Sequence, residues 1–172
     1  MKKWFGLLLV LIWMLPGCAK EEQLENPVLF YYRTAQVSYF GDNGVIDCEK
    51  RESGTWPSGY MLEKWRYLLN QYMLGPESSE LSRTFPDRVS VLDLQLKDNV
   101  LTLMLSADFA KLTGLDLSLA CACLTLTACQ MTGAKAVKIW AQNALLDGNE
   151  AVTMEFSRLV LEDLCRVPVD PN

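Results

Sequence analysis

Hydrophobic and polar positions change their period along the chain, and the clearest change begins at Val89. From there to Leu105 the period is two, with leucines on one face and polar residues on the other: Leu92, Leu94, Leu96, Leu101, Leu103 and Leu105 against Asp93, Gln95 and Lys97. A tight turn at Asp98-Asn99 fits between the two runs. The segment therefore predicts a β-hairpin with one buried face.

A helical period precedes this hairpin. Apolar residues recur at steps of three and four from Met61 to Leu74, with Ser58 placed to cap the start and Gly75-Pro76 placed to end the helix. The apolar stripe of this amphipathic helix either binds a partner or packs on the protein's own core, and we favour packing. Residues 75–88 then form a polar loop.

A second helix is predicted from Asp116 to Met131, with Gly133 beyond its end. It is apolar nearly all round, so we expect it to be buried or to lie in an interface, and it is too short for a membrane span. Asp116 and the earlier Asp108 sit where helices should begin. We therefore interpret both carboxylates as helix-end caps and not as catalysts.

Four further segments have the composition of strands: Val28–Tyr32, Val45–Arg51, Ala136–Gln142 and Ala151–Phe156. A turn at Asp147-Gly148 precedes the last of them. We expect either Val28–Tyr32 or Ala136–Gln142 to form an open edge of the sheet.

The first 18 residues have the pattern of an export signal. Lys2 and Lys3 precede an apolar run from Trp4 to Leu15, which has the length of a signal core. Leu15-Pro16-Gly17-Cys18 follows and resembles a lipobox, although Pro16 departs from the small residue usual at that place. The sequence predicts cleavage before Cys18, a diacylglyceryl group on its thiol and an acyl group on its amine; the alternative is an uncleaved anchor with an incidental cysteine.

A polar segment from Ala19 to Asn26 follows Cys18, and eight extended residues reach at most about 26–29 Å. The folded domain should therefore stay close to the membrane. Since both lysines of the signal are removed, the mature chain has 14 basic and 21 acidic residues, a net charge of −7. That charge disfavours nucleic acid as a partner and disfavours a basic patch for anionic lipid.

The sequence contains no histidine. This excludes Ser–His–Asp and Cys–His mechanisms, and no nucleophile elbow or phosphate-binding glycine loop is present. The sequence predicts no enzymatic activity, no catalytic residue and no cofactor. The aromatic residues from Trp56 to Tyr60 could bind a ligand, but packing of a turn is the interpretation that we favour.

Five cysteines follow Cys18: Cys48, Cys121, Cys123, Cys129 and Cys165. On a helix Cys121 and Cys123 point to different sides, and Cys121 and Cys129 lie about 12 Å apart along the axis, so neither pair can form a disulfide. No Cys-x-x-Cys pair supports a metal site, so we expect small core residues and no bound metal. A disulfide between Cys48 and Cys165 remains an open alternative.

Short motifs between Val28 and Ile139 occur in the order of a known family. They are Val28-Leu29-Phe30-Tyr31, Glu49-x-Arg51, Leu74-Gly75-Pro76, Phe85-Pro86, Leu105-Ser106 with Asp108-Phe109, Thr125-Leu126-Thr127 and Val137-Lys138-Ile139. Behind a lipobox, this ordered set resembles the GerMN domain, the module named from a lipoprotein of spore germination and sporulation.

The resemblance implies an α+β fold like the ring-building modules of secretion-type assemblies, a small mixed sheet with two helices packed on one face. It implies a GerMN-like domain at residues 27–142, behind a signal peptide at 1–17 and a lipidated tether at 18–26. Residues 143–172 match nothing in the family and are expected to pack on the domain as an extension. The sporulation lipoprotein has two such modules, whereas this chain has one.

Two functions fit these observations. The first is a non-enzymatic lipoprotein on the outer face of the cytoplasmic membrane of a Gram-positive bacterium, which binds envelope proteins or copies of itself in sporulation or germination. The alternative is a module that binds a small ligand or the cell wall. A deep polar pocket would favour the alternative, and a flat surface or an open sheet edge would favour the first.

Overall fold

The computed structural model describes residues 26–36, 44–55 and 59–159. The predicted signal peptide, Cys18 and the tether up to residue 25 lie outside the described residues, as do Trp56, Ser58 and Cys165. The predictions that rest on these residues are therefore not tested by the structure.

The described chain forms two sheets and two α-helices, which confirms the α+β class. The first sheet is antiparallel in the order β2-β1-β3, made of β1 (Pro27–Thr34), β2 (Ile46–Glu52) and β3 (Leu81–Ser82). The second has the order β4-β5-β6-β7, made of β4 (Val91–Lys97), β5 (Val100–Leu105), β6 (Ala136–Ala141) and β7 (Ala151–Glu155). Only β5 and β6 are parallel, since a helical crossover connects them. The strands thus divide between two sheets, where the sequence predicted one.

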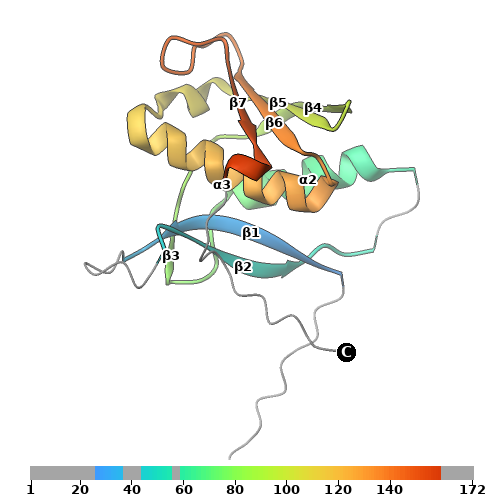
Figure 1. Ribbon diagram of the computed structural model, residues 1–172. Helices are drawn as coiled ribbons and strands as arrows, with labels where there is room; N and C mark the ends of the chain where they lie inside the picture. Colours follow the sequence, from blue (N-terminus) through green and yellow to red (C-terminus); the bar gives the residue numbers. More distant parts are fainter. Residues whose placement is uncertain (1–25, 37–43, 56–58, 160–172) are drawn as a thin grey trace, which may run out of the picture.

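Helix α3 (Gly114–Thr132) lies between the two sheets (Figure 1). It contacts β1 on one side and β5, β6 and β7 on the other, which explains why it is apolar nearly all round. The helix is 19 residues long and is apolar enough to cross a membrane by length and composition, so the expectation that it is too short was wrong. Its side chains are used in the protein core instead.

The hairpin of β4 and β5 is confirmed, with Asp98 and Asn99 at positive φ in its turn. Leu101, Leu103 and Leu105 are fully buried on the predicted face. The other strand differs from the prediction because a β-bulge shifts the register between Val91 and Asp93. The bulge puts Val91 on the buried face with Leu94, while Leu92 and Leu96 stay 38% and 36% exposed.

Helix α2 (Met61–Met73) is confirmed, and its stripe of Leu68, Leu69, Tyr72 and Met73 is buried in the core as favoured. Leu74 is its C-cap, and Gly75 follows at φ 104°, a conformation that suits glycine. The N-cap position is Tyr60, which makes no side-chain capping bond. The prediction that Ser58 caps the helix falls on a residue outside the described part of the chain.

Neither carboxylate that was predicted as a helix-end cap is one. Ser106 and Thr113 hold the N-cap positions of the 3-10 helix η2 (Ala107–Lys111) and of α3. Asp108 and Asp116 lie in the first turns, where they pair with Lys111 at 2.5 Å and with Arg33 at 2.6 Å. Acidic side chains are favourable there because of the helix dipole.

Strand β1 is the centre of the first sheet, but β3 pairs only with its last two residues, Arg33 and Thr34. Before them, side chains from the helices complete the backbone hydrogen bonds of β1. The Tyr31 N–H donates to Thr127 Oγ1 at 2.9 Å, and the Tyr31 carbonyl accepts from Tyr72 Oη at 2.5 Å. Tyr32 Oη in turn donates to the Tyr72 carbonyl at 2.9 Å. Burial raises the pKa of Tyr72 well above its usual value, so the phenol keeps the proton that it donates. One residue from each helix therefore bonds a backbone group of the same residue, Tyr31.

Both predicted open edges are wrong. β1, which contains Val28–Tyr32, lies between β2 and β3, and β6, which contains most of Ala136–Gln142, lies between β5 and β7. The outer strands of the described sheets are β2, β3, β4 and β7. A pattern of buried residues shows that a strand is covered, but it does not show which strand lies beside it.

The Thr127 hydroxyl can be tested by substitution. Thr127→Val keeps the side-chain shape but leaves the buried Tyr31 N–H without its acceptor. The free energy of unfolding, measured in urea, should therefore fall by about 1–3 kcal/mol. Thr127→Ser retains the hydroxyl and should lose much less stability. Equal losses in the two variants would mean that packing, and not the hydrogen bond, is responsible.

Candidate functional site

A connected polar cluster is built on Glu49 and Arg51 of β2. Two residues apart on a strand, their side chains share one face of the sheet. Arg51 Nε donates to Glu49 Oε1 at 2.7 Å, and the side chains are 16% and 11% exposed. Because both are largely shielded from water, each charge depends on the other.

The cluster fastens β2 to the segment that leaves α2. Arg51 donates to the Gly75 carbonyl at 2.8 Å, and the Glu49 carboxylate accepts from the backbone N–H groups of Glu77 and Ser78, each at 3.0 Å. The Arg51 guanidinium also lies over the Phe30 ring, 5.4 Å from its centre. The pair therefore holds the end of α2 against the first sheet.

This geometry fits a structural role better than a chemical one. Every oxygen of the carboxylate already accepts a hydrogen bond, and the guanidinium is shared among Glu49, the Gly75 carbonyl and an ion pair with Glu77 at 3.3 Å. Such a group has little capacity left to hold a ligand or to move a proton.

The other motif residues lie apart from this cluster, and the structure does not bring them into one site. Ser106 exchanges hydrogen bonds with Ser90 and donates to the Arg88 carbonyl, which fastens the end of β5. Phe109, Val137 and Ile139 are fully buried in the core. Thr127 binds β1, as described above. The family motifs thus mark the contacts that define the fold.

The helical cysteines are core residues. Cys121, Cys123 and Cys129 are buried and are not disulfide-bonded, as helical geometry predicted. Burial raises the pKa of the Cys121 and Cys123 thiols to about 12 and that of Cys129 to about 11, which keeps them protonated near neutral pH. Within the described residues no group of three His, Cys, Asp or Glu side chains is placed to hold a metal ion.

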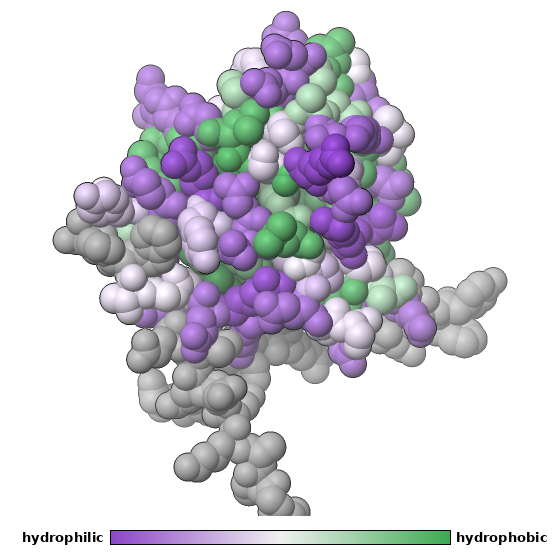
Figure 2. Space-filling model, turned by 180° about the vertical axis from the view of Figure 1, so that it is seen from behind, coloured by the Kyte–Doolittle hydropathy of each residue, from purple (hydrophilic) through white to green (hydrophobic). Residues whose placement is uncertain are grey.

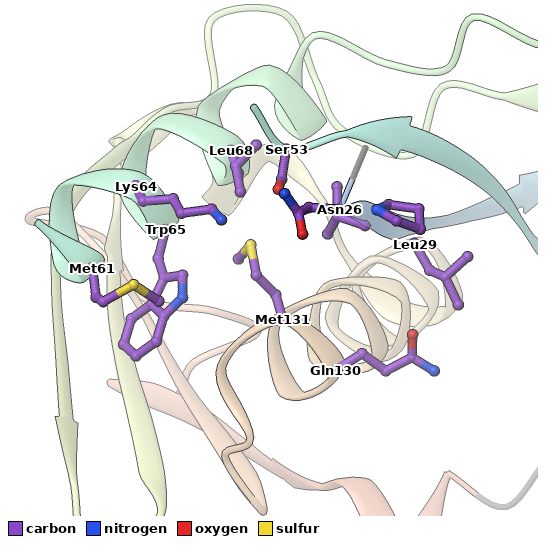
Figure 3. Close-up of a pocket in the computed structure, with 11 residues that line it drawn as sticks. Asn26, Leu29, Ser53, Met61, Lys64, Trp65, Leu68, Gln130 and Met131 are labelled. Atoms are coloured by element: carbon purple, nitrogen blue, oxygen red, sulfur yellow. The ribbon is translucent and has the colours of Figure 1, made fainter. Parts of the chain in front are cut away.

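Open pockets flank α2 where it faces the strands. One, of about 390 Å³, lies among the start of β1, the start of α2 and the end of α3; Figure 3 shows Lys64, Met131 and Asn26 around its opening. A second, of about 510 Å³, lies beside Arg51, Tyr67 and Gln71. Both are open to solvent, and nothing in the spacing of their residues along the sequence indicated them. Of the aromatic residues predicted to pack in a turn, Tyr60 is 56% exposed.

One face of the molecule carries both apolar and hydrophilic side chains. Seen from behind, apolar side chains form separate patches among hydrophilic ones (Figure 2). Such a face offers several separate apolar places for contact.

Arg51→Met should destabilise the fold strongly. The substitution leaves the Glu49 carboxylate shielded from water and without its cation, which costs about 3–5 kcal/mol in buried pairs. Arg83→Met is the matched control, because its ion pair with Asp87 has side chains that are 46% and 80% exposed and should contribute about 0–1 kcal/mol. Urea unfolding gives the free energy of unfolding of both variants. Similar losses would show that the Glu49–Arg51 pair contributes no more than an exposed ion pair.

Comparison with known proteins agrees with these motifs. Residues 39–147, more than half of the chain, match the model of the Germane family. The description of that family is "Sporulation and spore germination". Among solved structures, the chain is similar to a candidate lipoprotein from Clostridium perfringens, with 16% identity, a TM-score of 0.46, and coverage of 76% of this chain and 87% of that one. It is also similar to the first GerMN domain of the sporulation protein GerM from Bacillus subtilis, with 13% identity, a TM-score of 0.43, and coverage of 66% and 83%.

No curated protein matches the chain. The family match confirms the resemblance that the ordered motifs indicated, and it includes the Glu49–Arg51 pair, the hairpin and α3. The chain therefore belongs to the Germane family of sporulation and spore germination domains.

Proposed function

We propose that this protein is a lipid-anchored assembly module on the outer face of the cytoplasmic membrane, with Cys18 as the lipid attachment residue. It has no enzymatic activity and acts by binding other envelope proteins, or copies of itself, during sporulation or germination. The lipobox supports the anchor, and the family supports the process.

The observation that carries this proposal is the use of the motif residues. Glu49, Arg51, Ser106 and Thr127 are engaged in contacts within the domain, so they leave no constellation for chemistry. The pockets beside α2 are open and the chain has no histidine. These features favour surface contact over catalysis, and they favour it over the alternative of a small-ligand or cell-wall binding module.

Strand β7 is the edge best suited to such contact. At the other long edges, side chains occupy backbone groups: Asn70 bonds both the N–H and the carbonyl of Val91 on β4, and Asp47 accepts from the Cys48 N–H on β2. No comparable side-chain bond to the backbone of β7 occurs within the described residues. An edge without such protection can add a strand from another chain.

The direction of the β7 backbone groups follows from its register. Phe156 N–H donates to the Lys135 carbonyl, and the bonding alternates along the antiparallel pair of β6 and β7. The N–H groups of Thr153 and Glu155 therefore point away from β6, toward the outer edge. A substitution at Thr153 can remove an outward donor and leave the internal ladder in place.

The anchor is tested with Cys18→Ser. Because the thiol is the attachment atom, the variant should lose incorporation of a fatty-acid analogue and stay uncleaved or leave the membrane. Metabolic labelling and fractionation measure both effects. If the variant is labelled as strongly as the parent protein, the Cys18 assignment is wrong.

The edge is tested by crosslinking in native membranes. Thr153→Pro removes the outward N–H and should reduce crosslinked products several-fold, since proline is tolerated at an edge but cannot donate. Thr153→Ala keeps the N–H and should crosslink like the parent. Circular dichroism checks that both variants stay folded. Unchanged crosslinks in folded Thr153→Pro would exclude β7 pairing, and an absence of any crosslinked partner for the parent protein would favour the ligand-binding alternative.

A further inference from the structure

The first turn of α2 has an apolar face that the core does not cover. Met61 and Leu62 stand seven residues before Leu68 and Leu69, so each pair shares a helix face. Leu68 and Leu69 are 3% and 0% exposed, whereas Met61 and Leu62 are 45% and 48% exposed. The stripe that packs on the core thus continues about two turns beyond Leu68 and Leu69, to side chains that are half exposed. Tyr60, just before the helix, is a further large side chain that is 56% exposed.

This surface lies at the end of the molecule where the chain arrives from Cys18. The start of β1, the start of α2 and the end of α3 meet at one end (Figure 1), and Asn26, Met61 and Met131 line the same pocket (Figure 3). Asn26 is eight residues after Cys18, a span of at most about 26–29 Å. A lipid on Cys18 therefore keeps the bilayer within reach of the first turn of α2.

The charge at this end suits a phospholipid surface better than the rest of the chain does. The whole chain carries a net charge of −5, but in the first six residues of α2 two cations, Lys64 and Arg66, follow a single acid, Glu63. Neither cation forms an ion pair within the described residues, and Lys64 lies beside Trp65 at the pocket opening (Figure 3). Apolar side chains bordered by lysine, tyrosine and tryptophan are the composition of surfaces that lie in a membrane interface.

We propose that Tyr60, Met61 and Leu62 dock on the bilayer that holds the Cys18 lipid. The proposal rests on the proposed anchor at Cys18. The contact is small, and the acidic chain would not bind a bilayer through it from free solution. A tether raises the effective concentration of the surface at the membrane, so a weak contact becomes occupied. Docking would fix the orientation of the domain and turn the start of α3, at the opposite end of that helix, away from the membrane.

The test uses nitroxide labels on the full lipidated protein in vesicles of phosphatidylglycerol and phosphatidylethanolamine. Leu62→Cys and Leu74→Cys are labelled in a background that carries Cys48→Ser and Cys165→Ser. Leu74 is the matched control, since it is an exposed leucine at the other end of the same helix, 66% exposed. Oxygen partitions into bilayers and a nickel chelate stays in water. The ratio of the spin-label relaxation caused by oxygen to that caused by the nickel chelate should be several-fold higher at position 62 than at position 74.

Each other outcome overturns a stated part of the inference. Equal ratios at the two positions, in protein that mass spectrometry shows to be lipidated at Cys18, would exclude docking and leave the anchor intact. Protein without lipid at Cys18 would overturn the anchor and the docking together. Shielding of position 62 in native membranes, but not in lipid vesicles, would replace the bilayer with a protein partner. As a second variant, Leu62→Glu should abolish the protection of α2 amides from hydrogen exchange that vesicles provide, and Leu74→Glu should not.

Discussion

The structure depends on how the buried backbone N–H and carbonyl of Tyr31 find hydrogen-bond partners. In a wider sheet, a neighbouring strand would supply its partners, but α3 occupies that space and its own backbone groups are already bonded within the helix. Thr127 and Tyr72 supply the missing acceptor and donor instead. A helix can therefore lie beside the edge of a strand without leaving polar groups unpaired in the core, and this allows α3 to separate two sheets.

The Glu49–Arg51 pair extends the same arrangement to the end of α2. Tyr72 fixes the last turn of this helix to β1, and Arg51 fixes the segment after it to β2 through the Gly75 carbonyl. Both fastenings involve residues of the first sheet and of one helix end. These polar side chains therefore join the sheet and the helices of the domain to one another. Contact with other molecules is left to exposed strand edges and helix ends.

Much of the site could be read from the sequence as motifs, but not as contacts. Glu49-x-Arg51 and Thr125-Leu126-Thr127 were recognisable by their order, yet the sequence did not show that Glu49 binds the backbone of Glu77 and Ser78 or that Thr127 binds Tyr31. These contacts join residues up to 96 positions apart. The bond between Asn70 and Val91 had no sequence signal at all, because an asparagine in a helix is equally consistent with solvent exposure.

The sequence by itself determined the family, the α+β class, the hairpin turn at Asp98-Asn99 and the C-terminal ends of the two helices beside Gly75 and Gly133, because these follow from local periodicity, turn conformation and motif order. Tertiary structure alone decided how the strands divide into two sheets, which of them lie at the edges, and where the bulge places Val91 and Leu92. The reason is physical. Periodicity reports whether a side chain is covered, whereas the identity of what covers it depends on pairing and packing between segments that are distant along the chain.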